Sequence, residues 1–226
     1  MKPCACGESH DGRRIVLTGG PGAGKTAVLE LIRLFFCVHV KTLRESASIV
    51  FGGGFPRDHR WELRQAGQRA IYHVQRALES TAKIENAAVV LCDRGTVDGA
   101  AYWQGPGTIW SAVGSTLEAE VARYHAVIHL RTPRSRDAYN RENPIRIESL
   151  EEAAETDDRI AESWASHPRR YFVDATPDFL TKAARAMQIL RDEVPACCRR
   201  QVQPFLWSAS PLSDPSLPDV PEVTNA

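Results

Sequence analysis

The sequence predicts an α/β fold, in which a mostly parallel sheet of five strands lies between two layers of helices. Short apolar runs of strand length alternate with longer segments whose apolar residues recur every three or four positions. Strands that alternate with helices in this way form parallel sheets, and the connecting helices cover both faces. The chain has 226 residues and a hydrophobic content of 43%, which suffices for a core without disulfides or a structural metal.

The five expected strands are short and largely apolar. They cover Arg14–Thr18, His39–Leu43, Ala87–Cys92, Ala126–Leu130 and Tyr171–Val173. The first runs into a series of glycines, which favours a tight turn. After the second strand, Gly52–Pro56 breaks the apolar pattern, and we expect a loop there.

Five further segments have the apolar periodicity of amphipathic helices. They are Lys25–Cys37, His59–Lys83, about Ser115–Arg123, Leu150–Ser166 and Phe179–Val194. The order of strands and helices predicts one domain from residue 13 to residue 194, after a flexible lead of residues 1–12. Residues 195–226 contain six of the 14 prolines and few aliphatic residues, so we expect a disordered, proline-rich tail.

The charge balance excludes some classes of protein. The 28 Lys and Arg residues equal the 28 Asp and Glu residues in number, which argues against nucleic acid as the main partner. The longest apolar stretch, Leu29–Val40, is too short for a membrane span and contains Glu30 and Arg33. With no signal peptide evident, the six cysteines predict a reduced, cytoplasmic protein rather than a disulfide framework.

The N-terminal Cys4-x-Cys6 with His10 contains residue types that bind zinc. A fourth ligand and the usual spacing of a zinc motif are missing from this segment. We therefore interpret these cysteines as ordinary thiols in the N-terminal lead.

The most specific motif is the glycine-rich segment between the first strand and the first helix. It matches the pattern G-x-x-x-x-G-K-[ST] at Gly19, Gly20, Pro21, Gly22, Ala23, Gly24, Lys25 and Thr26. Backbone amides of such a loop converge on phosphate oxygens at a helix N-terminus. Lys25 is expected to reach the β- and γ-phosphates, and the Thr26 hydroxyl to ligate Mg²⁺. The sequence thus predicts a nucleotide-binding P-loop NTPase with a three-layer sandwich fold.

A second motif follows the third expected strand. This strand ends at Asp93, which is suited either to bind Mg²⁺ or to act as a general base on an acceptor hydroxyl. Arg94 beside it is a candidate for contact with a phosphate or with the substrate. The alternative is structural, with Asp93 capping the next turn and Arg94 paired with it.

Three segments together resemble NadR-like AAA-type ATP-binding domains. They are TGGPGAGKT (18–26), LCDRGTVDGAAYW (91–103) and RENPIRIE (141–148). The resemblance covers roughly residues 13–192, and the family includes the nicotinamide-riboside kinase domain. This family is more similar to small nucleoside and nucleotide kinases than to ring-forming AAA motors. The resemblance implies ATP or GTP with Mg²⁺ but does not identify the acceptor.

Kinases of this type close an arginine-bearing segment over the transferring phosphate. The candidate lid is 131–147, which carries five arginines, and Arg141 and Arg146 are the preferred catalytic residues; a solvated face with ion pairs is the alternative. Glu45 follows the second strand, and it and Arg57 are acceptor candidates. Asp98 and Tyr102, within the second motif, complete the expected substrate site.

The expected function is transfer of the ATP γ-phosphoryl group to a small, nucleoside-like acceptor. The alternative is a nucleotide-dependent switch with slow hydrolysis and a protein or lipid partner. The guanine-reading motif Asn-Lys-x-Asp is absent, which argues against an ordinary small GTPase. A motor ATPase is disfavoured because Asp93 is not followed by a second acid.

Overall fold

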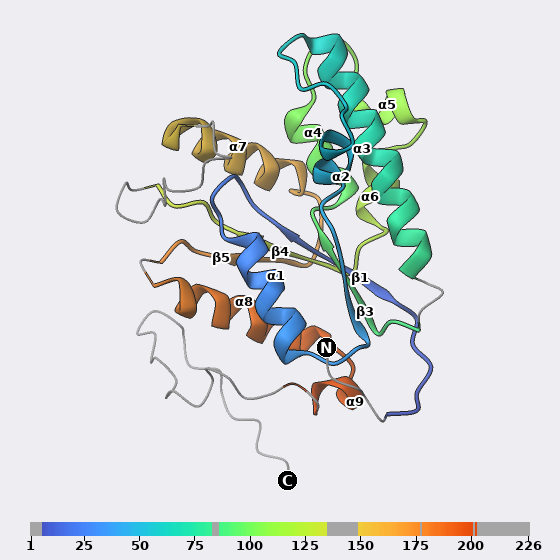
Figure 1. Cartoon of the computed structure of the whole chain (residues 1–226), viewed down its shortest axis with the longest axis vertical. Coiled ribbons are helices and arrows are strands. Elements are labelled where there is room, and N and C mark those ends of the chain that lie inside the picture. The colour runs from blue at the N-terminus through green and yellow to red at the C-terminus, as the bar shows by residue number, and fades with distance from the viewer. Residues whose placement is uncertain (1–5, 83–85, 135–148, 177, 201, 203–226) are drawn as a thin grey trace.

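The computed structural model describes residues 6–82, 86–134, 149–176, 178–200 and 202. Within these ranges, five strands form one sheet with the order β2-β3-β1-β4-β5, and all four pairings are parallel (Figure 1). The strands are β1 (Arg13–Thr18), β2 (Val40–Leu43), β3 (Val89–Asp93), β4 (Ala126–Leu130) and β5 (Arg170–Val173). The predicted α/β fold is therefore confirmed.

The sheet separates two apolar cores because successive side chains of a strand point to opposite faces. Ile15 and Leu17 of β1 belong to the core on one face, whereas Val16 belongs to the core on the other. Helices α1 (Lys25–Phe35) and α8 (Phe179–Glu193) pack on the first face. On the second face Val16 packs with Ile160 and Trp164, in and just after α7 (Leu150–Ser163).

The five expected helices are present, with ends that differ from the predicted ones by a few residues. Besides α1, α7 and α8 they include α3 (Trp61–Thr81) and α6 (Leu117–Val121). The structure adds short helical segments that the sequence did not indicate, because three to seven residues give too little periodicity. These are α2 (Ser46–Gly52), η2 (Thr96–Asp98), α4 (Gly99–Tyr102), α5 (Ile109–Val113) and α9 (Ala196–Arg199).

The C-terminal boundary expected after Val194 is too early. Cys198 in α9 and Val202 beyond it are buried in the same core as α1 and α8. The sequence did not predict this burial, because residues 195–226 as a whole are rich in proline and contain few aliphatic residues. Residues 203–226, the rest of the expected tail, lie outside the described residues.

The N-terminal lead is likewise held in part against the domain. The backbone N–H of His10 donates to Asn86 Oδ1 at 2.8 Å, and Asn86 Nδ2 donates to the carbonyl oxygen of Glu8 at 3.1 Å. Residues 6–12 therefore have contacts to the turn that precedes β3. In the described part of the chain, no helix has the length and apolar character of a membrane span.

A buried polar network fastens α3 to the rest of the second face. Glu79 of α3 accepts hydrogen bonds from Arg123 and from the Tyr124 hydroxyl, the latter at 2.7 Å. Glu120 accepts hydrogen bonds from the hydroxyls of Tyr72 and Thr96, both at 2.7 Å. Because buried carboxylates are stable only when they are paired and hydrogen-bonded, this network fixes α3 relative to α6 and η2.

Candidate functional site

The glycine-rich loop connects β1 to α1 at the carboxyl edge of the sheet. Gly19 has a φ of 135°, and a Cβ atom there would lie 2.0 Å from the carbonyl oxygen of Leu130. Gly24 precedes α1 with a φ of 89°, in the left-handed region. The loop thus requires glycine both for backbone conformation and for its close approach to the end of β4.

Lys25, the first residue of α1, folds back over this loop. Its ammonium group donates to the carbonyl oxygens of Gly19 at 2.7 Å and Gly20 at 3.0 Å. Removal of the ammonium from water and the charge of Arg94 lower the pKa of Lys25 to about 7, against the opposing effect of Asp93. The ammonium group of Lys25 therefore lies over the first two residues of the loop.

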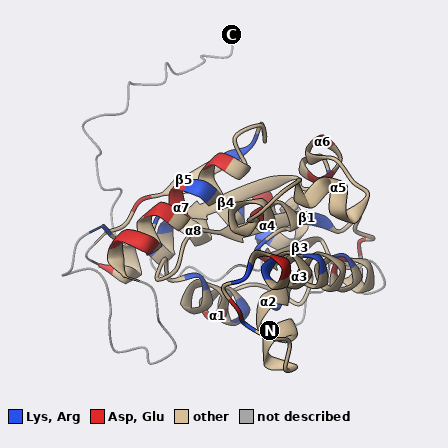
Figure 2. Ribbon diagram, turned by 90° about the horizontal axis from the view of Figure 1, so that it is seen from above, with Lys and Arg blue, Asp and Glu red and all other residues tan. Residues whose placement is uncertain are grey.

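A buried carboxylate from α7 holds the loop at Gly20. Asp157 Oδ1 accepts a hydrogen bond from the Gly20 N–H at 2.7 Å and lies 2.9 Å from His129 Nε2. Arg131 donates to the other oxygen at 3.1 Å. Nothing in the sequence sets Asp157 apart, since it is one of many acids along α7 (Figure 2).

A buried lysine from α8 holds the loop at Ala23. Lys182 Nζ donates to the carbonyl oxygens of Ala23 at 2.9 Å and Arg131 at 2.6 Å, and burial lowers its pKa to about 8. The sequence carries no signal for this residue, because a lysine in an amphipathic helix ordinarily faces water.

Asp93 ends β3 directly beside Leu17 of β1, so it lies next to the start of the loop. Its Oδ1 atom is buried and has no hydrogen-bond partner among the described residues. Burial raises the pKa of Asp93 to about 6, although Lys25 acts in the opposite direction. Asp93, Thr26 and Glu45 line a cavity of about 410 Å³.

Arg94, the residue after Asp93, forms ion pairs with Glu45 and Asp98. Its backbone has a φ of 67°, which few non-glycine residues adopt. Its Nε atom donates to Glu45 Oε1 at 2.9 Å, and its guanidinium lies 5.6 Å from the centre of the Tyr102 ring. The described ion pairs of Arg94 are with Glu45 and Asp98, which does not match the expected alternative of an Asp93–Arg94 pair.

Asp98 is buried and engaged within the protein. It accepts hydrogen bonds from the Thr18 hydroxyl, from the Gly95 N–H at 2.9 Å and from Trp164 Nε1 at 3.1 Å. Both carboxylate oxygens are thereby occupied. This geometry makes Asp98 a residue that positions the turn after β3.

A second cavity of about 540 Å³ opens beside the loop. The predicted substrate residues Glu45, Arg57, Asp98 and Tyr102 all line it, as does Pro21 of the loop. Its other walls include apolar and aromatic side chains that the sequence did not single out. These are Phe51, Leu63, Ile71, Tyr72 and Ile109.

Only the first residues of the expected lid are described. Arg131 pairs with Asp157 and Asp158, and Arg134 pairs with Asp158 at 2.6 Å. These two arginines therefore fit the alternative to a lid, namely a solvated face with ion pairs. The preferred residues Arg141 and Arg146 lie outside the described residues.

A parallel sheet with this strand order, a glycine-rich loop after β1 and a lysine opening α1 define a P-loop NTPase fold. A family model described as an AAA domain matches residues 14–182, and the chain belongs to this family. This agrees with the NadR-like resemblance of its motifs.

Two solved structures are similar to the chain in fold. The crystal structure of NadR protein in complex with NR gives a TM-score of 0.63 at 15% identity and covers 81% of this chain and 52% of that one. The structure of NadR protein in complex with NAD and AMP-PNP gives a TM-score of 0.58 at 13% identity and covers 86% of this chain and 51% of that one. The chain thus spans about half the length of these proteins. A comparison with curated proteins finds no match.

Replacement of Asp157 by alanine should destabilise the domain by about 3 kcal/mol, because His129, Arg131 and the Gly20 N–H lose a buried partner. Chemical unfolding at pH 7 measures this. The matched control is Asp158→Ala, which removes an exposed carboxylate and should cost less than about 1 kcal/mol. Equal losses in the two variants would contradict the anchoring role.

The contact between Asp157 and His129 also predicts that the stability of the domain depends on pH. Burial alone would raise the pKa of Asp157, but the hydrogen bond and charge of His129 hold it well below its ordinary value of 3.8. A carboxyl whose pKa is lower in the folded state than in the unfolded chain stabilises the folded state at pH values above its unfolded-state pKa. This stabilisation is lost as the pH falls from the unfolded-state pKa towards the folded-state pKa. The difference between wild type and Asp157→Asn should therefore shrink below about pH 4.

For Asp93 we expect the opposite dependence of stability on pH. Because burial raises its pKa from 3.8 to about 6, the folded state holds the proton more tightly, and wild type loses stability as the pH rises through this window. Asp93→Asn does not titrate there. Without nucleotide, its stability relative to wild type should rise by on the order of 2 kcal/mol between pH 4 and pH 7. Chemical unfolding across this range tests it, and a constant difference would refute it.

Proposed function

We propose that this domain is a kinase that transfers the γ-phosphoryl group of ATP or GTP to a small, nucleoside-like acceptor. The observation that carries the proposal is the second cavity, which adjoins the phosphate loop at Pro21 and extends for about 540 Å³. A protein that only binds or hydrolyses nucleotide needs no second ligand beside the loop. A kinase needs an acceptor within reach of the γ-phosphate.

The loop is the proposed phosphate site. Backbone amides from Gly19 to Gly24 and the N-terminus of α1 supply hydrogen-bond donors and partial positive charge. Lys25 would exchange its bonds to the Gly19 and Gly20 carbonyls for phosphate oxygens. A phosphate beside the ammonium favours its charged form, so nucleotide binding would raise the lowered pKa of Lys25.

Thr26 and Asp93 fit the Mg²⁺ that accompanies the nucleotide. Both are oxygen donors that line the same cavity, and Asp93 Oδ1, for which the described residues offer no hydrogen-bond partner, is suited to a hard cation or its water shell. When bound, the ion would neutralise phosphate charge. Since phosphoryl transfer through a loose transition state requires mainly positioning, we assign Asp93 to the ion and to orientation of the acceptor.

The acceptor site combines apolar walls with a few placed charges. The walls formed by Phe51, Ile71 and Ile109 suit a flat ring. Glu45 and Arg94, which pair with one another, both line this cavity, and Glu45 also lines the smaller cavity with Thr26 and Asp93. Hydroxyl groups of an acceptor would find a carboxylate there. The NadR structure in complex with NR supports a nucleoside-like acceptor.

Closure of the site is assigned to the arginine-bearing segment 131–147. In this proposal, Arg141 and Arg146 would neutralise charge on the transferring group. The paired Arg131 and Arg134 would remain attached to α7 and serve as the base of the segment.

The decisive experiment incubates the protein with Mg-ATP or Mg-GTP and a panel of nucleosides and cofactor precursors. A phosphorylated product is expected, and Lys25→Ala and Asp93→Asn should each lower its rate by at least about 100-fold. The matched control is Asp192→Asn, an exposed residue of α8 that should retain full activity. Nucleotide-dependent thermal stabilisation without product from any acceptor would contradict the kinase.

The acceptor cavity has its own test. Ile71→Trp should fill the cavity and raise the acceptor KM by at least about 10-fold, while nucleotide-dependent thermal stabilisation persists. Leu34→Trp, at a 63% exposed position of α1, is the matched control and should leave the acceptor KM unchanged. An unchanged acceptor KM in Ile71→Trp would place the acceptor elsewhere.

A further inference from the structure

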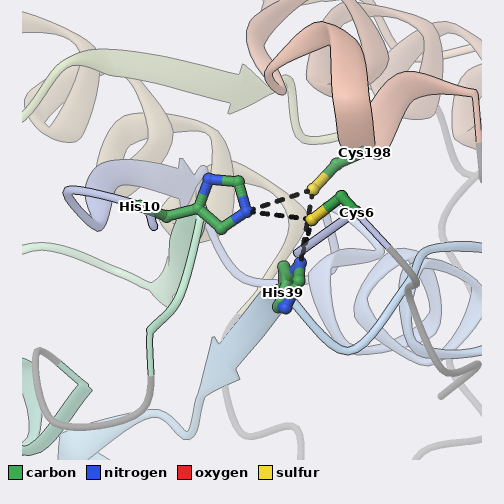
Figure 3. A group of neighbouring side chains, drawn as sticks. All are labelled: Cys6, His10, His39 and Cys198. Atoms are coloured by element: carbon green, nitrogen blue, oxygen red, sulfur yellow. Dashed lines mark hydrogen bonds between the residues drawn. The ribbon is translucent and has the colours of Figure 1, made fainter. Parts of the chain in front are cut away.

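Four zinc-type ligands from distant parts of the sequence meet at one point of the structure. They are Cys6, His10, His39 and Cys198 (Figure 3). One ligand atom from each residue lies within 4.8 Å of the other three. The local sequence pattern contains only Cys4, Cys6 and His10, because His39 and Cys198 are 33 and 192 residues further along than Cys6.

The sulfur-to-nitrogen distances match a tetrahedral zinc ion. Cys6 Sγ lies 3.5 Å from His10 Nε2 and 3.4 Å from His39 Nδ1. Cys198 Sγ lies 3.9 Å and 3.6 Å from the same two atoms. Tetrahedral zinc, with bonds of about 2.3 Å to sulfur and 2.0–2.1 Å to nitrogen, places such atoms about 3.6 Å apart.

The ligand types also select the metal. Two thiolates and two imidazoles form one of the ligand sets of structural zinc, whereas magnesium and calcium prefer oxygen. Because the protein supplies four donors, a tetrahedral ion has no open position for a substrate or water. The site is therefore suited to hold structure rather than to catalyse a reaction.

The location supports this role. His10 precedes β1 and His39 directly precedes β2, so both lie at the amino edge of the parallel sheet, opposite the edge with the phosphate loop. Cys198 is in α9, which follows α8 back to this edge. The cluster thus joins the N-terminal lead, the sheet and the C-terminal end of the described domain.

Contacts around the cluster position its members. The rings of His10 and His39 meet edge to face with centroids 4.8 Å apart, and the backbone N–H of His10 is held by Asn86. Cys198 is buried, whereas the other three ligands are half-buried. The ligand atoms therefore already converge, and an ion requires only small movements of the side chains.

We propose that Cys6, His10, His39 and Cys198 bind one structural zinc ion, which ties the N-terminal lead and α9 to the amino edge of the sheet. Both thiols lose their protons when the ion binds, and the zinc undergoes no redox change. The proposal does not depend on the kinase activity, since the cluster and the phosphate loop lie at opposite edges of the sheet.

The test uses the full chain, purified under reducing conditions without chelator. Elemental analysis should find one zinc per chain, and Cys198→Ser and His39→Ala should each reduce this to less than about a tenth. The matched control is Cys197→Ser, because Cys197 Sγ lies 3.9 Å from Cys198 Sγ but is not in the cluster. Cys197→Ser should keep its zinc. Equal loss from Cys197→Ser and Cys198→Ser would overturn the assignment.

A spectroscopic measurement on wild type keeps the proposal testable if a variant fails to fold. Cobalt(II) in place of zinc should give the visible bands of a tetrahedral ion together with thiolate-to-metal charge-transfer absorption. Removal of the metal by a chelator should lower the melting temperature, and added zinc should restore it. The proposal would be overturned if the protein contained no zinc and its cobalt(II) form gave an octahedral spectrum. A disulfide between Cys6 and Cys198 in the reduced preparation would overturn it as well.

Discussion

The close approach of the glycine-rich loop to the end of β4 and to α7 is the constraint on which the rest of the site depends. Leu130 leaves no room for a side chain at Gly19, and Asp157 binds the Gly20 N–H at 2.7 Å. Lys182 secures the other side through the Ala23 carbonyl. Since these residues come from β4, α7 and α8, the loop can take its shape only when the sheet and both helical layers are assembled.

The loop and the strand end beside it bring two charged, partly buried side chains close together. Lys25 and Asp93 have pKa values displaced toward neutrality in opposite directions, mainly by desolvation. Such an arrangement reduces the stability of the unliganded protein, and a bound anion with its metal ion would relieve it. The Glu45–Arg94 pair extends the charged region into the larger cavity, so the proposed nucleotide and acceptor sites share one boundary.

The two edges of the sheet carry different proposed sites. At the carboxyl edge, loops that follow the strands bring together the residues proposed to bind ligands, as is general for open α/β sheets. At the amino edge, the proposed zinc ligands would fasten segments that contribute little apolar surface of their own. The burial of Cys198 and Val202 shows that the domain extends beyond the change in composition at residue 195.

The sequence by itself determined the fold class and the phosphate loop, and it drew attention to the strand end at Asp93. These features rest on local patterns, namely apolar periodicity and a motif of fixed spacing. It also indicated Glu45, Arg57, Asp98 and Tyr102, which the structure brings to one cavity, but it could not show that hydrogen bonds within the protein occupy both carboxylate oxygens of Asp98. Only the tertiary structure decided that Asp157 and Lys182 hold the loop and that His39 and Cys198 join Cys6 and His10. The physical reason is sequence separation: contacts between residues 137 or 159 positions apart leave no trace in local composition or periodicity.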